Sequence, residues 1–179
     1  MATTRLPGMS LLAVACVLTL SACTPAPGNG GAPADPAPGA SASSAGSAGS
    51  DDDGRTVVTA VNTAEASAGG RAFELEREDD GWQVHVAVGD RDVEVLVASD
   101  GTTVRSSNDD DGIDGDERAA LDAAVTTLAD AVRIAATRNA GGERLDEVQL
   151  EDEGGTWIWQ VDLSGGGTVR VSAADGSIL

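Results

Sequence analysis

The chain has 179 residues, with 30 acidic and 11 basic side chains and a formal net charge of −19 at pH 7. All eleven basic residues are arginines scattered along the chain, so we expect no basic patch for nucleic acid. Two cysteines and one histidine argue against a cysteine metal site and give little support to a nucleophilic catalytic site.

Residues 1–22 have the three parts of a bacterial secretory signal. Arg5 lies near the amino terminus, and an apolar core over residues 11–20 is about half as long as a membrane-spanning helix needs to be. The sequence Leu20-Ser21-Ala22-Cys23 that follows is typical of a lipobox. We therefore predict lipidation of Cys23, which would anchor the protein at the extracytoplasmic face of the cell membrane. The alternative is an ordinary secretory signal with an incidental cysteine.

Residues 23–54 consist mainly of proline, glycine, alanine and serine and end in an acidic run. Such a composition has too little apolar surface to offset the entropy lost on ordering. We predict a disordered tether over this segment, with the folded part beginning at residue 55.

Residues 55–107 form the first predicted unit, a helix followed by an antiparallel meander. Apolar residues on one side predict a helix over 56–68, which Gly69-Gly70 would end. Alternating apolar and polar residues then predict strands joined by short turns that contain glycine. These strands are expected over 73–77, 82–88 and 93–97.

Residues 108–179 contain an acidic linker, a helix and a second meander, in the same order as the first unit. The strand pattern from Trp157 to Leu163 matches the pattern from Trp82 to Val88 at a constant offset of 75 residues. We interpret the two units as tandem repeats. The alternative is two unrelated segments that each contain a helix and strands.

The start of the second helix is open to two interpretations. Thr127 stands three residues before Asp130, a spacing that resembles a capping box. This pair favours a break near Thr126 over one long helix across residues 116–139.

The acidic linker contains candidates for a weak calcium site. The four candidates are Asp109, Asp111, Asp114 and Asp116. Their spacing relative to Gly112 and Gly115 does not fit the twelve-residue loop of an EF-hand. We favour a solvated linker and predict no metal site and no cofactor.

Three of the four aromatic residues are tryptophans, Trp82, Trp157 and Trp159. Packing between sheet and helix is the favoured role for them, and an aromatic patch that binds a partner is the alternative. His85, which stands between alternating valines, is expected to face solvent. A role as metal ligand or general base would need partners that the sequence does not identify.

The second unit resembles the PepSY family, and the first unit resembles it more distantly. The resemblance rests on Leu128 and Val132 in the helix, the strand from Trp157 to Leu163, and the segment from Val169 to Leu179 with its Asp175-Gly176 turn. It implies an α+β fold of two tandem PepSY-like repeats, each a helix followed by an antiparallel β-meander.

The same resemblance implies a non-catalytic module that inhibits or regulates proteases outside the cytoplasm. Because no protease follows Leu179, we expect regulation in trans of a protease or another envelope protein. The alternative is a passive structural or cation-binding envelope lipoprotein.

Overall fold

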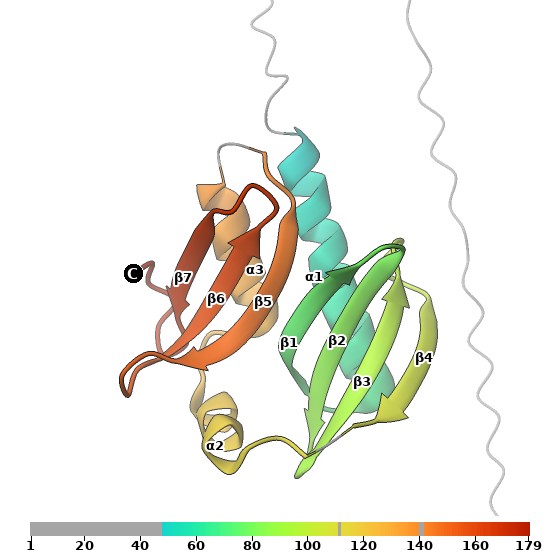
Figure 1. Ribbon diagram of the computed structural model, residues 1–179, viewed down its shortest axis with the longest axis vertical. Helices are drawn as coiled ribbons and strands as arrows, with labels where there is room; N and C mark the ends of the chain where they lie inside the picture. The colour runs from blue at the N-terminus through green and yellow to red at the C-terminus, as the bar shows by residue number, and fades with distance from the viewer. Residues whose placement is uncertain (1–47, 111, 140–141) are drawn as a thin grey trace, which may run out of the picture. The chain divides into compact units, whose positions relative to one another are not determined.

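The computed structural model describes residues 48–110, 112–139 and 142–179, so the predicted signal segment and Cys23 lie outside the described residues. The elements are α1 (Ala48–Ala68), β1 (Arg71–Glu78), β2 (Gly81–Val88), β3 (Arg91–Ala98), β4 (Val104–Asp109), α2 (Gly115–Ala123), α3 (Leu128–Arg138), β5 (Leu145–Asp152), β6 (Trp157–Leu163) and β7 (Thr168–Ser172). The predicted α+β class and every predicted strand are confirmed (Figure 1).

The seven strands form one antiparallel sheet in the order β4-β3-β2-β1-β5-β6-β7. Two meanders therefore run outward from a central β1–β5 pair, which joins residues 74–76 to residues 147–149. The C-terminal residues lie along the outer edge of β7, where Ile178 forms an isolated antiparallel β-bridge with Val171. Among the described residues, β4 at the opposite edge has β3 as its one strand neighbour.

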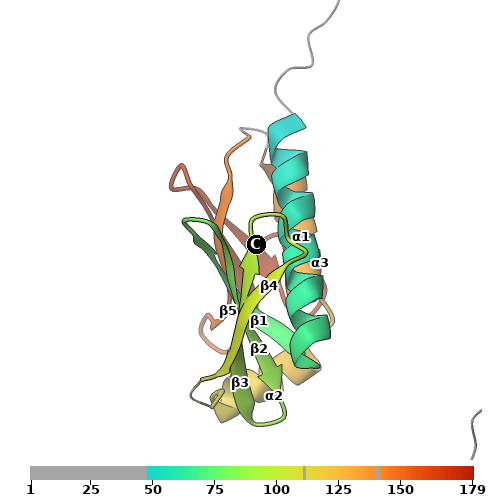
Figure 2. The ribbon, with the colours of Figure 1, turned by 90° about the vertical axis from the view of Figure 1, so that its right-hand side faces the viewer.

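Helices α1 and α3 lie side by side on one face of the sheet (Figure 2). The inward side of α1 is fully buried at Val57, Ala60, Val61 and Ala64. Alternate residues of the strands meet this side, as the period of two in a half-buried strand requires. The largest fully buried strand residues in this core are Leu75, Val84, Val86, Val95, Val97 and Trp159. No helix within the described residues is long and apolar enough to cross a bilayer.

Helix α1 begins at Ala48, so the prediction that the tether reaches residue 54 is wrong at its end. Asp52 and Asp53 lie near the N-terminal end of the helix, where negative charge is favourable. Asp53 also accepts hydrogen bonds from Arg77 and from the backbone N–H of Leu145. These tertiary contacts stabilise the helical conformation of residues that were predicted to be disordered from their composition.

The predicted helix break is confirmed. Thr127 caps α3, with its side chain accepting from the Asp130 N–H and the Asp130 carboxylate accepting from Thr127. The short helix α2 lies before this break, and Asp114 caps it. In contrast, β4 was not predicted, because its largely exposed residues include a single apolar side chain, Val104.

The β3–β4 turn is pressed against α1 at Gly101, which has a φ of +72°. A Cβ atom there would lie 2.8 Å from the Thr56 carbonyl oxygen, and Thr63 Oγ1 donates to the Gly101 carbonyl at 2.8 Å. We expect Gly101→Ala to lower the free energy of unfolding by about 2 kcal/mol, through left-handed strain and the close approach. Urea unfolding followed by tryptophan fluorescence measures the loss.

Gly89→Ala is the matched control, because Gly89 has a φ of +65° and a Cβ atom added there would have no heavy atom within 4 Å. That substitution isolates the conformational strain, which we expect to cost about 1 kcal/mol. Equal losses in the two variants would show that the contact between Gly101 and α1 contributes nothing.

Candidate binding cleft

A cleft of about 730 Å³ opens beside the N-terminal part of α1. Its walls come from α1, from the β1–β2 hairpin, and from the loop that leads into β5. The lining residues that carry charge are Asp52, Asp53, Arg77, Glu78, Asp79 and Arg144. Both meanders therefore contribute to one concave surface with charges of both signs.

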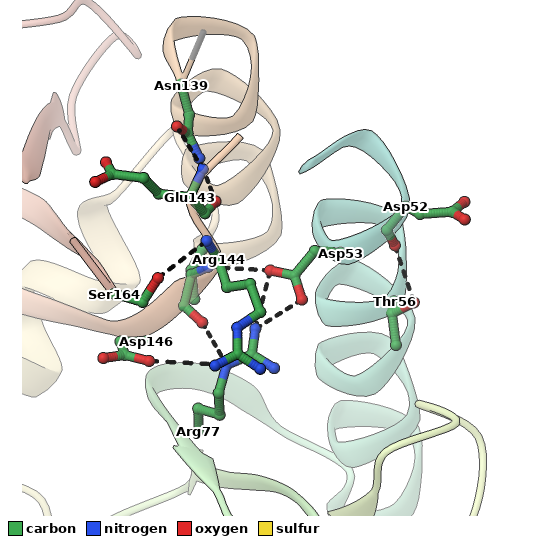
Figure 3. Close-up of polar contacts among 10 residues, drawn as sticks. Asp52, Asp53, Thr56, Arg77, Asn139, Glu143, Arg144, Asp146 and Ser164 are labelled. Carbon is green, nitrogen blue, oxygen red and sulfur yellow. Dashed lines mark hydrogen bonds and ion pairs between the residues drawn. The ribbon is translucent and has the colours of Figure 1, made fainter. Parts of the chain in front are cut away.

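The ion pair between Asp53 and Arg77 forms one wall of the cleft (Figure 3). Arg77 Nη2 donates to both Asp53 oxygens, at 2.7 and 2.9 Å. Asp53 Oδ2 also accepts from the Leu145 N–H at 3.0 Å, and Arg77 Nε donates to the Leu145 carbonyl at 2.7 Å. The exposed fractions of the Arg77 and Asp53 side chains are 19% and 16%. This partly buried network ties α1 to β1 and β5.

Trp82 lies beneath Arg77, with the guanidinium carbon 4.0 Å from the centroid of its ring. This geometry is a cation–π contact, and it is stronger when water is excluded. The side chain is almost fully buried, and its Nε1 has no acceptor among the described residues. Trp82 therefore supports the cleft from inside the fold and fixes the position of Arg77.

Arg144 is the exposed cation of the cleft, and its side chain extends toward the same space as Arg77 (Figure 3). Its backbone is fixed to the β6–β7 turn, because Arg144 N–H donates to Ser164 Oγ and Ser164 N–H donates to the Arg144 carbonyl. Within the described residues no carboxylate pairs with its guanidinium, whereas Arg77 is paired with Asp53. The cleft thus presents a positively charged group that is available to a carboxylate or carbonyl of a ligand.

The three tryptophans, for which a partner-binding patch was the alternative to core packing, do not form one patch. Trp159 is fully buried, and its Nε1 donates to the Thr126 carbonyl at 2.9 Å. This burial makes Trp159 a core residue and excludes it from a binding surface. Trp157 is half-buried against the core, and Trp82 alone among the three lines the cleft.

The described calcium candidates do not assemble into a ligand set. Asp109 lies in β4 and pairs with Arg91 at 2.6 Å. Asp114 caps α2 and accepts from the Asp116 N–H at 2.8 Å. Asp111, like Cys23, lies outside the described residues.

The residues that build the cleft were missed by sequence reasoning. Asp53 stood in the segment interpreted as a tether, and Arg77 appeared as a polar residue of an alternating strand. Arg144 belongs to a loop without a motif. The one available signal was the acidic run at the end of the predicted tether. Acidic residues are enriched in the first turn of helices, so this run could have indicated that the helix starts earlier.

The C-terminal part of the chain matches the model of a known family. Residues 127–179 match the PepSY model, described as "Peptidase propeptide and YPEB domain". A PepSY domain is present over these residues. It extends from the Thr127 cap of α3 to the end of the chain, and it contributes Gly142 and Arg144 to the cleft. This finding confirms the resemblance predicted for the second unit.

A crystal structure of a "putative lipoprotein" from Clostridium difficile 630 is similar at 14% sequence identity. The alignment covers 67% of this chain and 87% of that chain, with a TM-score of 0.41. No curated protein matches the sequence.

Proposed function

We propose that this protein is a non-catalytic, lipid-anchored binding module that regulates or inhibits a protease or another envelope protein in trans. The main support for the proposal is the cleft, whose walls come from the PepSY domain and from the segment before it. The description of the PepSY model includes peptidase propeptides, which supports a protease as the class of partner. The lipobox pattern ending at Cys23 supports an extracytoplasmic location.

The proposal includes a repeat relationship between the two halves. Each half has a helix followed by an antiparallel meander, and the two meanders run outward from the β1–β5 pair. Trp82 and Trp157 occupy matching places near the start of β2 and β6. These features support a divergent PepSY-like repeat in the first half, with the cleft at the junction of two related units.

A polar, extended segment of a partner is the ligand that suits this cleft. Arg144 offers an exposed guanidinium with several N–H donors for a carboxylate or main-chain carbonyl. Glu78 and Asp79 on the hairpin side supply negative charge for a basic side chain. Opposite charges on the two sides would orient the bound segment and select against partners of the wrong polarity.

Affinity capture with the tagged full-length chain tests the proposal. Membrane and secreted fractions of the producing bacterium are passed over wild-type protein and over Arg144→Glu, and bound proteins are identified by mass spectrometry. We expect a protease or envelope protein that wild type retains and Arg144→Glu retains at least tenfold less. Proteolytic activity of that partner is then measured with and without the full chain.

Arg138→Glu is the matched control, since Arg138 is an exposed arginine at the end of α3 and is absent from the cleft lining. It reverses one charge in the same domain and should leave capture unchanged. Equal capture by wild type, Arg144→Glu and Arg138→Glu would exclude the cleft as the binding surface. A captured protease whose activity the chain does not alter would exclude inhibition.

A further inference from the structure

A second polar cluster lies on the sheet face opposite α1 and α3. His85 on β2 and Glu94 on β3 are direct cross-strand partners, and they alternate with the buried valines that face the helices. Asp110 follows β4 and is held against the same hairpin, because its N–H donates to the Asp92 carbonyl at 3.1 Å. Two strands and the segment after β4 thus bring one imidazole and two carboxylates to one place.

The spacing of these groups suits a single metal ion. Candidate ligand atoms of His85, Glu94 and Asp110 all lie within 4.8 Å of one another, and no other group of three in the described part of the chain meets this criterion. Zinc binds nitrogen and carboxylate ligands at about 2.0–2.2 Å. A small inward rotation of side chains would therefore bring all three groups into contact with one ion.

The His85 ring is oriented for ligation. Its Nδ1 lies 2.6 Å from Asp92 Oδ2, and an ionised carboxylate can only accept, so Nδ1 carries the proton. The lone pair of the neutral ring is then on Nε2. A histidine that donates one ring N–H to a carboxylate while the other nitrogen binds metal is a common arrangement in zinc proteins.

A hydrogen-bond donor already stands where a cation would be attracted. Gln83 Nε2 lies 3.1 Å from His85 Nε2 and 3.2 Å from Glu94 Oε2. The lone pair of the imidazole and the Glu94 carboxylate therefore point toward a shared position. A metal ion at that position would satisfy both groups more strongly than one amide does.

Asp92, which contacts the His85 ring, has a second carboxylate oxygen that is buried without a partner among the described residues. This oxygen is Oδ1, and the side chain as a whole is 9% exposed. Unsatisfied buried groups of this kind are uncommon and costly. A cation on the far nitrogen of His85 would polarise the Nδ1–H toward Asp92 and partly compensate the buried charge.

The surroundings of the cluster are acidic. Burial, followed by the nearby charges of Glu74 and other carboxylates, raises the pKa of Glu117 above its usual range. Negative potential of this kind attracts cations. An imidazole nitrogen among the ligands favours a transition metal over calcium or magnesium, which prefer oxygen.

We propose that His85, Glu94 and Asp110 bind one divalent transition-metal ion of the zinc class, with Asp92 positioning the His85 ring. The bound ion would join the β2–β3 hairpin to the segment that leads from β4 toward α2. Water would complete the coordination, because three protein ligands leave at least one position of a tetrahedral site open.

The test uses the full-length chain carrying Cys16→Ser and Cys23→Ser, which removes both thiols from competition for zinc. After treatment with a chelator, ZnCl₂ is titrated by calorimetry and followed by thermal unfolding. We expect one saturable site, and at about 100 times its Kd a rise in Tm of about 5–10 °C. Because His85 is the single histidine, its ring ¹⁵N signals report directly whether Nε2 is ligated and Nδ1 keeps its proton.

Variants separate this site from general attraction of zinc to an acidic protein. Glu94→Gln and the exposed Asp110→Asn should each weaken zinc binding at least tenfold, and Asp92→Asn by about 10–100-fold. Glu151→Gln removes a carboxylate from β5 and should leave the affinity unchanged. Unaltered affinity in Glu94→Gln and Asp110→Asn, an equal loss in Glu151→Gln, or displacement of zinc by equimolar calcium would overturn the proposal.

Discussion

Replacing Trp159 with alanine is expected to lower the free energy of unfolding by about 3–5 kcal/mol, because it removes a large, fully buried side chain. The substitution also leaves the Thr126 carbonyl without its 2.9 Å donor. Trp159 joins β6 to the residue just before the Thr127 cap, so we expect α3 to be loosened as well. Urea unfolding followed by circular dichroism measures the loss.

Trp157→Ala is the control for this prediction, since Trp157 lies two residues away on the same strand but is only half-buried. Its loss should be clearly smaller, about 1–2 kcal/mol, in proportion to the area that it buries. Trp159→Phe keeps most of the apolar volume and isolates the hydrogen bond to Thr126, at about 1–2 kcal/mol. If the two alanine variants were equally stable, Trp159 would not be the centre of this half of the core.

Replacing Asp53 with alanine is expected to lower the free energy of unfolding by about 3 kcal/mol. The substitution leaves the partly buried Arg77 guanidinium without its carboxylate partner and the Leu145 N–H without an acceptor. The loss should appear in both halves of the fold, since Arg77 belongs to β1 and Leu145 to β5. Hydrogen exchange of the two strands, together with urea unfolding, measures it.

Asp52→Ala provides the matched control on the preceding residue. Asp52 pairs with Arg55, and both side chains are more than 70% exposed, so the expected change is below about 0.5 kcal/mol. A double variant, Asp53→Ala with Arg77→Met, should recover part of the stability by removing the unpaired charge. Equal losses for Asp52→Ala and Asp53→Ala would mean that the network at the cleft adds no more than a surface ion pair.

Periodic signals allowed most of the fold to be predicted. Alternating apolar residues located β2, β3 and β6, and the spacing of Thr127 and Asp130 located the start of α3. The strand β4 carries no such alternation, and its pairing with β3 is set by the Asp100–Thr103 turn, where Asp100 accepts from the N–H groups of Thr102 and Thr103. The start of α1 was missed because Asp53 is held by residues far away in the sequence.

The two polar sites differ in how far a sequence can reveal them. A two-residue turn after Val88 sets the β2–β3 register, so the pairing of His85 with Glu94 follows from the predicted hairpin. Asp110 could not be placed, because its position depends on β4. The cleft depends on the approach of Asp53, Arg77 and Arg144 from three distant segments, and no local pattern encodes such an approach.

The order of strands has a consequence for how the chain folds. Every strand pair except β1–β5 joins consecutive strands, so each meander can form through short-range contacts. The β1–β5 pair instead closes a long loop between residues 74–76 and 147–149. Closing this loop costs conformational entropy of the chain before the contacts of the pair can stabilise it. We therefore expect the docking of two preformed halves to limit the folding rate.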